Sequence, residues 1–108
     1  MVGINRTSIA KQFIRMINLV AFDICSVEDI LISQPADPLS FIIKCRMTEA
    51  IDPTLHAHLR RCIKSEGKRN NVLIGKIRLE HSIEITVYQK SLRNAAYVHG
   101  ESPQDKEL

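Results

Sequence analysis

A chain of 108 residues, of which 44% are hydrophobic and 25% are charged, is predicted to fold as one globular domain, and this composition excludes disorder over most of its length. Aromatic residues make up only 5% and tryptophan is absent, so the core must be mainly aliphatic. No apolar run approaches the ~20 residues of a membrane-spanning helix, so we expect no membrane partner.

The first expected element is an amphipathic helix over residues 8–24, capped by Thr7 or Ser8. Apolar residues recur along it at helical spacing, at Ile9, Phe13, Met16, Ile17, Val20 and Ile24. Leu19 and Phe22 lie outside this stripe, toward the polar side of the helix. Either a second layer of the fold covers these two side chains, or they bind a protein partner.

Residues 26–34 allow two readings. Ser26, followed three positions later by Asp29, resembles the start of a short helix, whereas residues 30–32 read as a buried strand, which we favour. Two prolines then break the chain. Alternation of apolar and polar residues over 39–48 predicts an antiparallel strand with one solvated face.

A central helix is predicted over residues 53–66. Asp52 is placed to cap it, Pro53 suits its first turn, and Gly67 is the expected stop. Its apolar stripe comprises Leu55, Leu59, Cys62 and Ile63.

Residues 72–79 and 83–90 have strand patterns with apolar residues at odd positions. A hairpin is the favoured arrangement, although one long strand is compatible with the same pattern. A short helix is allowed over residues 91–98. We therefore predict an α+β fold of order α-β-β-α-β-β, with a small, mostly antiparallel sheet, in a single domain over residues 1–98 and a flexible polar tail over 99–108.

Three widely spaced cysteines without a C-x-x-C pair indicate reduced thiols and a cytoplasmic setting. His58 and Cys62, four residues apart, would supply two zinc ligands, and Cys25 and Cys45 would have to complete the site. Three small apolar cysteines packed in the core are the favoured interpretation. We expect no metal and no cofactor.

Positive charge concentrates between residues 53 and 81, where seven basic and two acidic residues give +5, against +3 for the whole chain. The basic residues are Arg60, Arg61, Lys64, Lys68, Arg69, Lys76 and Arg78. Cations near a helix C-terminus complement its dipole, which accounts for the helical ones but not for those beyond it. With Tyr88 on an outward strand face, this ridge is also suited to an anionic partner such as nucleic acid.

No catalytic motif is present: there is no phosphate-binding glycine loop, no nucleophile elbow and no H-E-x-x-H. His56 or His58 beside the arginines allows a small phosphate-ester enzyme as one hypothesis. The favoured function is a non-enzymatic protein-interaction module, an adaptor, inhibitor or chaperone-like protein that uses Leu19 and Phe22 and self-associates or binds a protein partner. The alternative is a nucleic-acid-binding protein that uses the basic ridge.

Overall fold

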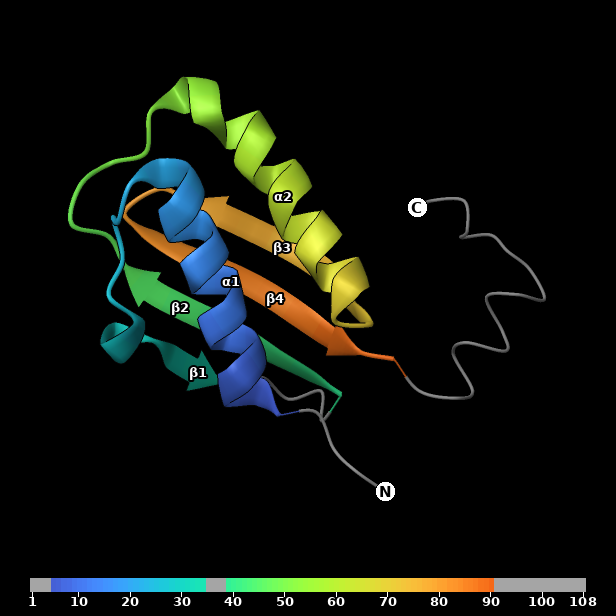
Figure 1. Ribbon diagram of the computed structural model, residues 1–108. Helices are drawn as coiled ribbons and strands as arrows, with labels where there is room; N and C mark the ends of the chain where they lie inside the picture. Colours follow the sequence, from blue (N-terminus) through green and yellow to red (C-terminus); the bar gives the residue numbers. More distant parts are fainter. Residues whose placement is uncertain (1–4, 35–38, 91–108) are drawn as a thin grey trace.

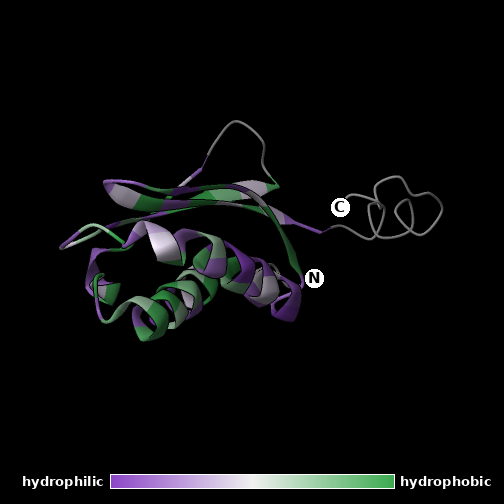
Figure 2. Cartoon of the chain, turned by 90° about the horizontal axis from the view of Figure 1, so that it is seen from above, coloured by the Kyte–Doolittle hydropathy of each residue, from purple (hydrophilic) through white to green (hydrophobic). Residues whose placement is uncertain are grey.

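In the computed structural model, which describes residues 5–34 and 39–90, two helices pack on one face of a four-stranded antiparallel sheet (Figures 1 and 2). In chain order the elements are α1 (Arg6–Ala21), the 3-10 turn η1 (Val27–Asp29), β1 (Leu31–Ser33), β2 (Ser40–Arg46), the 3-10 turn η2 (Pro53–Leu55), α2 (His56–Arg69), β3 (Val72–Leu79) and β4 (Ser82–Gln89). The predicted α+β class and element order are confirmed. The helix allowed over 91–98 and the tail over 99–108 lie outside the described residues.

The strand order in the sheet is β1-β2-β4-β3, with every neighbouring pair antiparallel. β2 and β4 are therefore central, and β1 and β3 form the two edges. β3 and β4 are joined by a short turn at Glu80 and His81, so this region is a hairpin rather than one long strand.

The core lies between the helices and the inner face of the sheet. In β2 the inward side chains are Phe41, Ile43 and Cys45, as the alternation predicts. The largest fully buried apolar side chains come from both helices and both central strands: Phe13, Ile14, Ile17, Leu59, Ile63, Phe41, Ile43, Ile83, Ile85 and Val87. Both described helices lie on this one face, and no described helix or strand covers the other face, called here the open face of the sheet (Figure 2).

α1 begins and ends earlier than predicted. Asn5, not Thr7 or Ser8, is the N-cap, and its side chain accepts a hydrogen bond from the amide of Ser8 at 3.0 Å. The helix ends at Ala21, because Phe22 adopts left-handed backbone geometry. The buried face includes Ala10, Ile14 and Ala21, whereas Met16 and Val20 are only partly buried.

Both readings of residues 26–34 apply, each to one part of the segment. Ser26 caps η1 by accepting a hydrogen bond from the amide of Glu28 at 3.3 Å. The favoured strand follows immediately, as β1, but the expectation that it is buried is wrong: β1 is an edge strand, and Leu31 is 67% exposed.

α2 continues past its predicted end, so the expectation that Gly67 stops the helix is wrong. Gly67 is buried inside the helix, where a Cβ atom would lie 2.5 Å from Cγ1 of Ile74. Left-handed geometry occurs instead at Asn71, with φ of 59°. Consequently Lys68 and Arg69 belong to the last helical turn, where cations complement the helix dipole.

A β-bulge in β3 overturns the predicted odd phase of this strand. The pairs Ile74–Val87 and Ile77–Ile85 leave two residues of β3 opposite one residue of β4. Before the bulge the even positions face inward, so Val72 is buried and Leu73 is 46% exposed.

Candidate functional site

The end of α1 carries two large apolar side chains that the fold does not use. Leu19 is 83% exposed and Phe22 is 81% exposed, more than any other large hydrophobic residue in the described part of the chain. No second layer of described residues covers them. Among the described residues, therefore, neither side chain has a place in the core, which was one of the two alternatives that their positions on the helix left open.

Phe22 also has an unfavourable backbone conformation. Its φ of 62° and ψ of 60° lie in the left-handed region, and the next residue, Asp23, has φ of 58°. A bulky L-residue in this region costs roughly 1–2 kcal/mol relative to right-handed geometry. Since most of the Phe22 side chain stays in solvent, burial recovers little of that cost.

Asn18 shapes the turn that presents Phe22. Its main-chain oxygen accepts hydrogen bonds from the amides of Phe22 and Asp23, the latter at 3.0 Å. Its side chain spans the backbone of Cys25, donating to the carbonyl at 2.8 Å and accepting from the amide at 2.9 Å. Sequence reasoning missed this role, because an asparagine on the polar side of a helix gives no sign of a partner seven residues away.

Replacing Asn18 with alanine should destabilise the protein by about 2 kcal/mol, because the amide and the carbonyl of buried Cys25 would both lose their partner. Asn18→Asp keeps an acceptor for the amide but sets a carboxylate oxygen against the carbonyl of Cys25, so it should also destabilise the protein. Urea unfolding of both variants, with Gln12→Ala as an exposed control on the same helix, measures the difference. An unchanged midpoint for Asn18→Ala would show that these two hydrogen bonds do not hold the turn.

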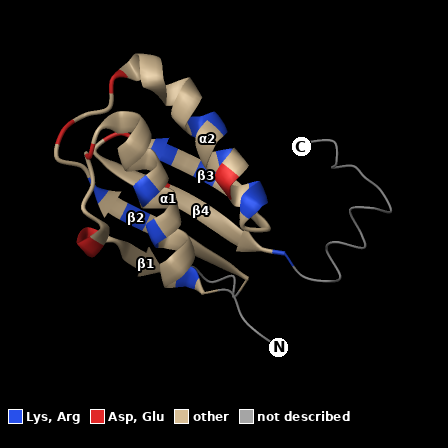
Figure 3. Cartoon of the chain, viewed as in Figure 1, with Lys and Arg blue, Asp and Glu red and all other residues tan. Residues whose placement is uncertain are grey.

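The predicted cationic residues are all exposed, and they lie on α2 and on the adjacent strand β3 (Figure 3). Arg60 lies on the flank of α2 beside β3, where its Nη1 donates to the carbonyl of Ile77 at 3.0 Å. Lys64 and Lys68 follow on the solvent side of the helix and do not line the groove between the helices. Lys76 and Arg78 lie on β3 itself. Arg61 and Arg69 line the other flank, which faces α1.

Tyr88 lies on the open face of the sheet and is 38% exposed. Its ring rests against Gly75 of the bulge, where a Cβ atom would lie 2.6 Å from Cε2 of the tyrosine. Tyr88 thus covers a glycine of the edge strand from the neighbouring strand, and this packing is a structural role for its ring. Near Arg78 on the same face, Glu84 forms an ion pair with Lys44 at 3.9 Å, which lowers the local positive charge.

The thiols divide into a buried pair and a half-buried single residue. Burial raises the pKa of Cys25 to about 12 and also raises the pKa of Cys45, so both stay protonated at neutral pH. Cys62 Sγ lies 3.8 Å from His58 Nε2. Among residues 5–34 and 39–90, no group of three or more histidine, cysteine or acidic side chains is placed to hold a metal ion.

Within the described ranges, neither helix combines the length and the apolar composition that a bilayer-spanning segment requires. Comparison with protein-family models, with curated proteins and with solved structures found no match to this chain.

Proposed function

We propose that this protein is a non-enzymatic protein-interaction module that binds a partner protein through the C-terminal end of α1. The observation that carries this proposal is the exposure of Leu19 and Phe22, 83% and 81%, on one short stretch of the chain. Neither side chain contributes to the core, and Phe22 occupies a backbone conformation in which glycine would be less strained.

Two exposed apolar side chains three residues apart at a helix end form a compact anchor for a protein partner. Protein interfaces are enriched in aromatic residues, and a few buried anchors supply most of the binding free energy. The turn that Asn18 holds supports this role, because a backbone that is already ordered loses less conformational freedom on binding.

Affinity purification from the native host, with nuclease treatment and quantitative mass spectrometry, tests the proposal. We expect wild type to retain a partner that Leu19→Glu/Phe22→Glu loses while the variant stays folded. Leu31→Glu is the matched control, because Leu31 is 67% exposed but pairs with Lys44 on the open face of the sheet. If the double variant unfolds, or if it recovers the same proteins as wild type, the proposal is wrong. Light scattering at several concentrations shows whether the partner is a second copy.

Nucleic-acid binding is the second candidate function, and one arrangement favours it. Lys64 and Lys68 lie on α2, and Lys76 and Arg78 lie on β3, the edge strand that α2 packs against, so two neighbouring elements carry four exposed cations. Contacts from cations to phosphate are largely independent of sequence and weaken as counterions are added.

Charge reversal separates this candidate from non-specific attraction. If three phosphates are contacted, log affinity for labelled single-stranded RNA should fall with log salt at a slope of roughly −2 to −3. Lys64→Glu/Lys68→Glu/Arg78→Glu should abolish retention at low salt. Lys11→Glu/Arg15→Glu/Arg61→Glu, with the same change in net charge, should retain it. Equal loss in both variants would mean that net charge alone attracts the RNA.

A further inference from the structure

A groove of about 500 Å³ separates α1 from α2 on the side of the helices away from the sheet. Its apolar part is formed by Met16, Leu19 and Cys62, and its arginines are Arg15, Arg61 and Arg69. Leu19 belongs both to this groove and to the exposed end of α1. The groove therefore continues the apolar surface that we assign to partner binding.

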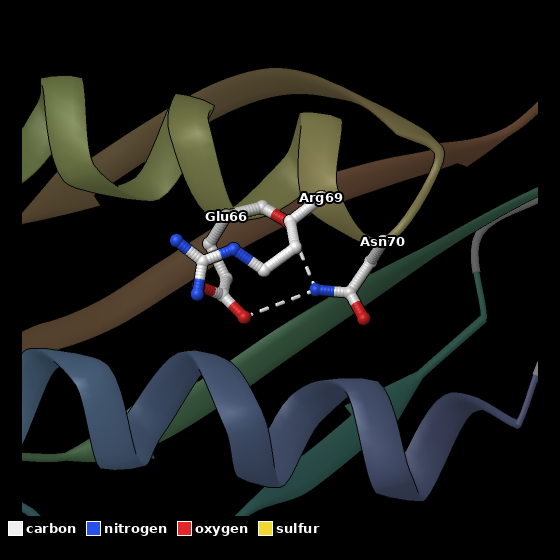
Figure 4. A network of polar contacts seen from close by, with 3 residues as sticks. All are labelled: Glu66, Arg69 and Asn70. Carbon is white, nitrogen blue, oxygen red and sulfur yellow. Dashed lines mark hydrogen bonds and ion pairs between the residues drawn. The ribbon is translucent and has the colours of Figure 1, made fainter.

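Glu66 is the one acidic residue among those that line the groove, and its carboxylate is already engaged (Figure 4). The side chain is 10% exposed and accepts a hydrogen bond from Asn70 Nδ2 at 3.1 Å. Arg69 Nη1 lies 3.8 Å from its other oxygen. Arg69 and Glu66 therefore partly neutralise each other. The positive charge of the groove comes mainly from Arg15 and Arg61.

Arg15 and Arg61 stand on opposite walls, one on α1 and one on α2, and both are exposed. Within residues 5–34 and 39–90, neither guanidinium forms an ion pair or a side-chain hydrogen bond. The groove thus presents an apolar floor between two unengaged cations.

We propose that this groove binds an acidic amphipathic helical segment of the partner protein. The inference rests on the proposed function and names the chemistry of the partner. A helix laid between α1 and α2 would place apolar residues at i, i+3, i+4 and i+7 on Met16, Leu19 and Cys62. Carboxylates on its two sides would meet Arg15 and Arg61, where bidentate contacts are available to a guanidinium.

A displayed library of random peptides of about 16 residues, roughly four helical turns, tests the inference when it is selected on the wild-type protein. We expect enriched peptides to carry net negative charge with apolar residues at helical spacing. Fluorescence anisotropy should show that the affinity of Arg15→Glu/Arg61→Glu for the best peptide is roughly tenfold or more below that of wild type. Lys64→Glu/Lys68→Glu is the matched control, because it makes the same charge change at two residues of α2 that do not line the groove, and it should leave affinity within about twofold.

Several outcomes would overturn the inference. Enriched peptides that are neutral or basic, or equal losses in the two variants, would show that the groove does not select acidic partners. Displacement of the peptide by single-stranded RNA would assign the arginines to nucleic acid, and a dimer that Arg15→Glu/Arg61→Glu dissociates would assign the groove to a second copy. Binding that Leu19→Glu/Phe22→Glu abolishes but Arg15→Glu/Arg61→Glu does not would retain the proposed function and reject the acidic partner. If wild type enriches no peptide and retains no protein, both proposals fail.

Discussion

Phe22→Gly should make the protein more stable and at the same time weaken its partner binding. Glycine adopts the φ of 62° without the clash that a bulky L-residue makes, and part of this gain is offset by greater freedom in the unfolded chain. We expect a net increase of about 0.5–1 kcal/mol in the free energy of unfolding. Loss of an exposed aromatic anchor should weaken binding roughly 30-fold or more, equivalent to about 2 kcal/mol. Urea unfolding and calorimetric titration with the purified partner measure the two effects.

Phe22→Ala separates the two causes. Alanine removes the ring but keeps the left-handed penalty, so binding should fall as in Phe22→Gly while stability stays close to wild type. A less stable Phe22→Gly variant would mean that the ring packs against the fold after all. Full affinity in both variants would remove Phe22 from the interface.

The predicted interface residues show where sequence periodicity succeeds and where it stops. Leu19 falls off the apolar stripe of α1, and its exposure follows from that phase, whereas Phe22 lies beyond the end of the helix. The turn at Phe22 did not follow, because left-handed geometry at a phenylalanine is set by hydrogen bonds from Asn18, not by local propensity. Periodicity reports which side a residue faces and not what holds it there.

The placement of the cations on α2 was harder to predict, because two inward residues are not apolar. Glu66 lies within the predicted stripe, but Gly67 lies next to Arg60 on the helix, and its burial extends the inward face of α2 toward Arg60. A stripe drawn through apolar residues alone therefore places Arg60 directly outward, whereas the structure places it beside β3. The sequence shows which residues of α2 are basic. Which of them face β3 and which face α1 depends on the rotation of the helix, and the close packing of Gly67 on Ile74 sets that rotation.

The bulge in β3 had a similar effect on the sheet. One additional residue inverts the inward and outward faces of the strand before it, and Gly75 is its only local sign. β4 has no bulge, and its inward residues Ile83, Ile85 and Val87 follow the predicted alternation. Prediction thus succeeded where pairing is regular and failed where one strand carries an extra residue.

Gly67→Val should destabilise the protein by about 3 kcal/mol, and lower Tm by roughly 10–20 °C, because the new side chain must occupy the space of Ile74. A Cβ atom alone would lie 2.5 Å from Cγ1 and 2.9 Å from Cδ1 of Ile74. Thermal unfolding followed by circular dichroism measures the loss. Ser65→Val, at an exposed position of the same helix, is the control for β-branching and should change stability by less than about 1 kcal/mol.

Ile74→Ala identifies the cause of this loss. Removing the atoms that collide should restore much of the stability of Gly67→Val, so the double variant should be more stable than the sum of the single effects by about 1–2 kcal/mol. Had Gly67 been the left-handed stop of the helix, the penalty would arise from its own backbone, and Ile74→Ala would not relieve it. Additive losses would therefore contradict the close approach of α2 to β3, and with it the rotation of α2 that turns Arg60 toward the edge of the sheet and Arg61 toward the groove.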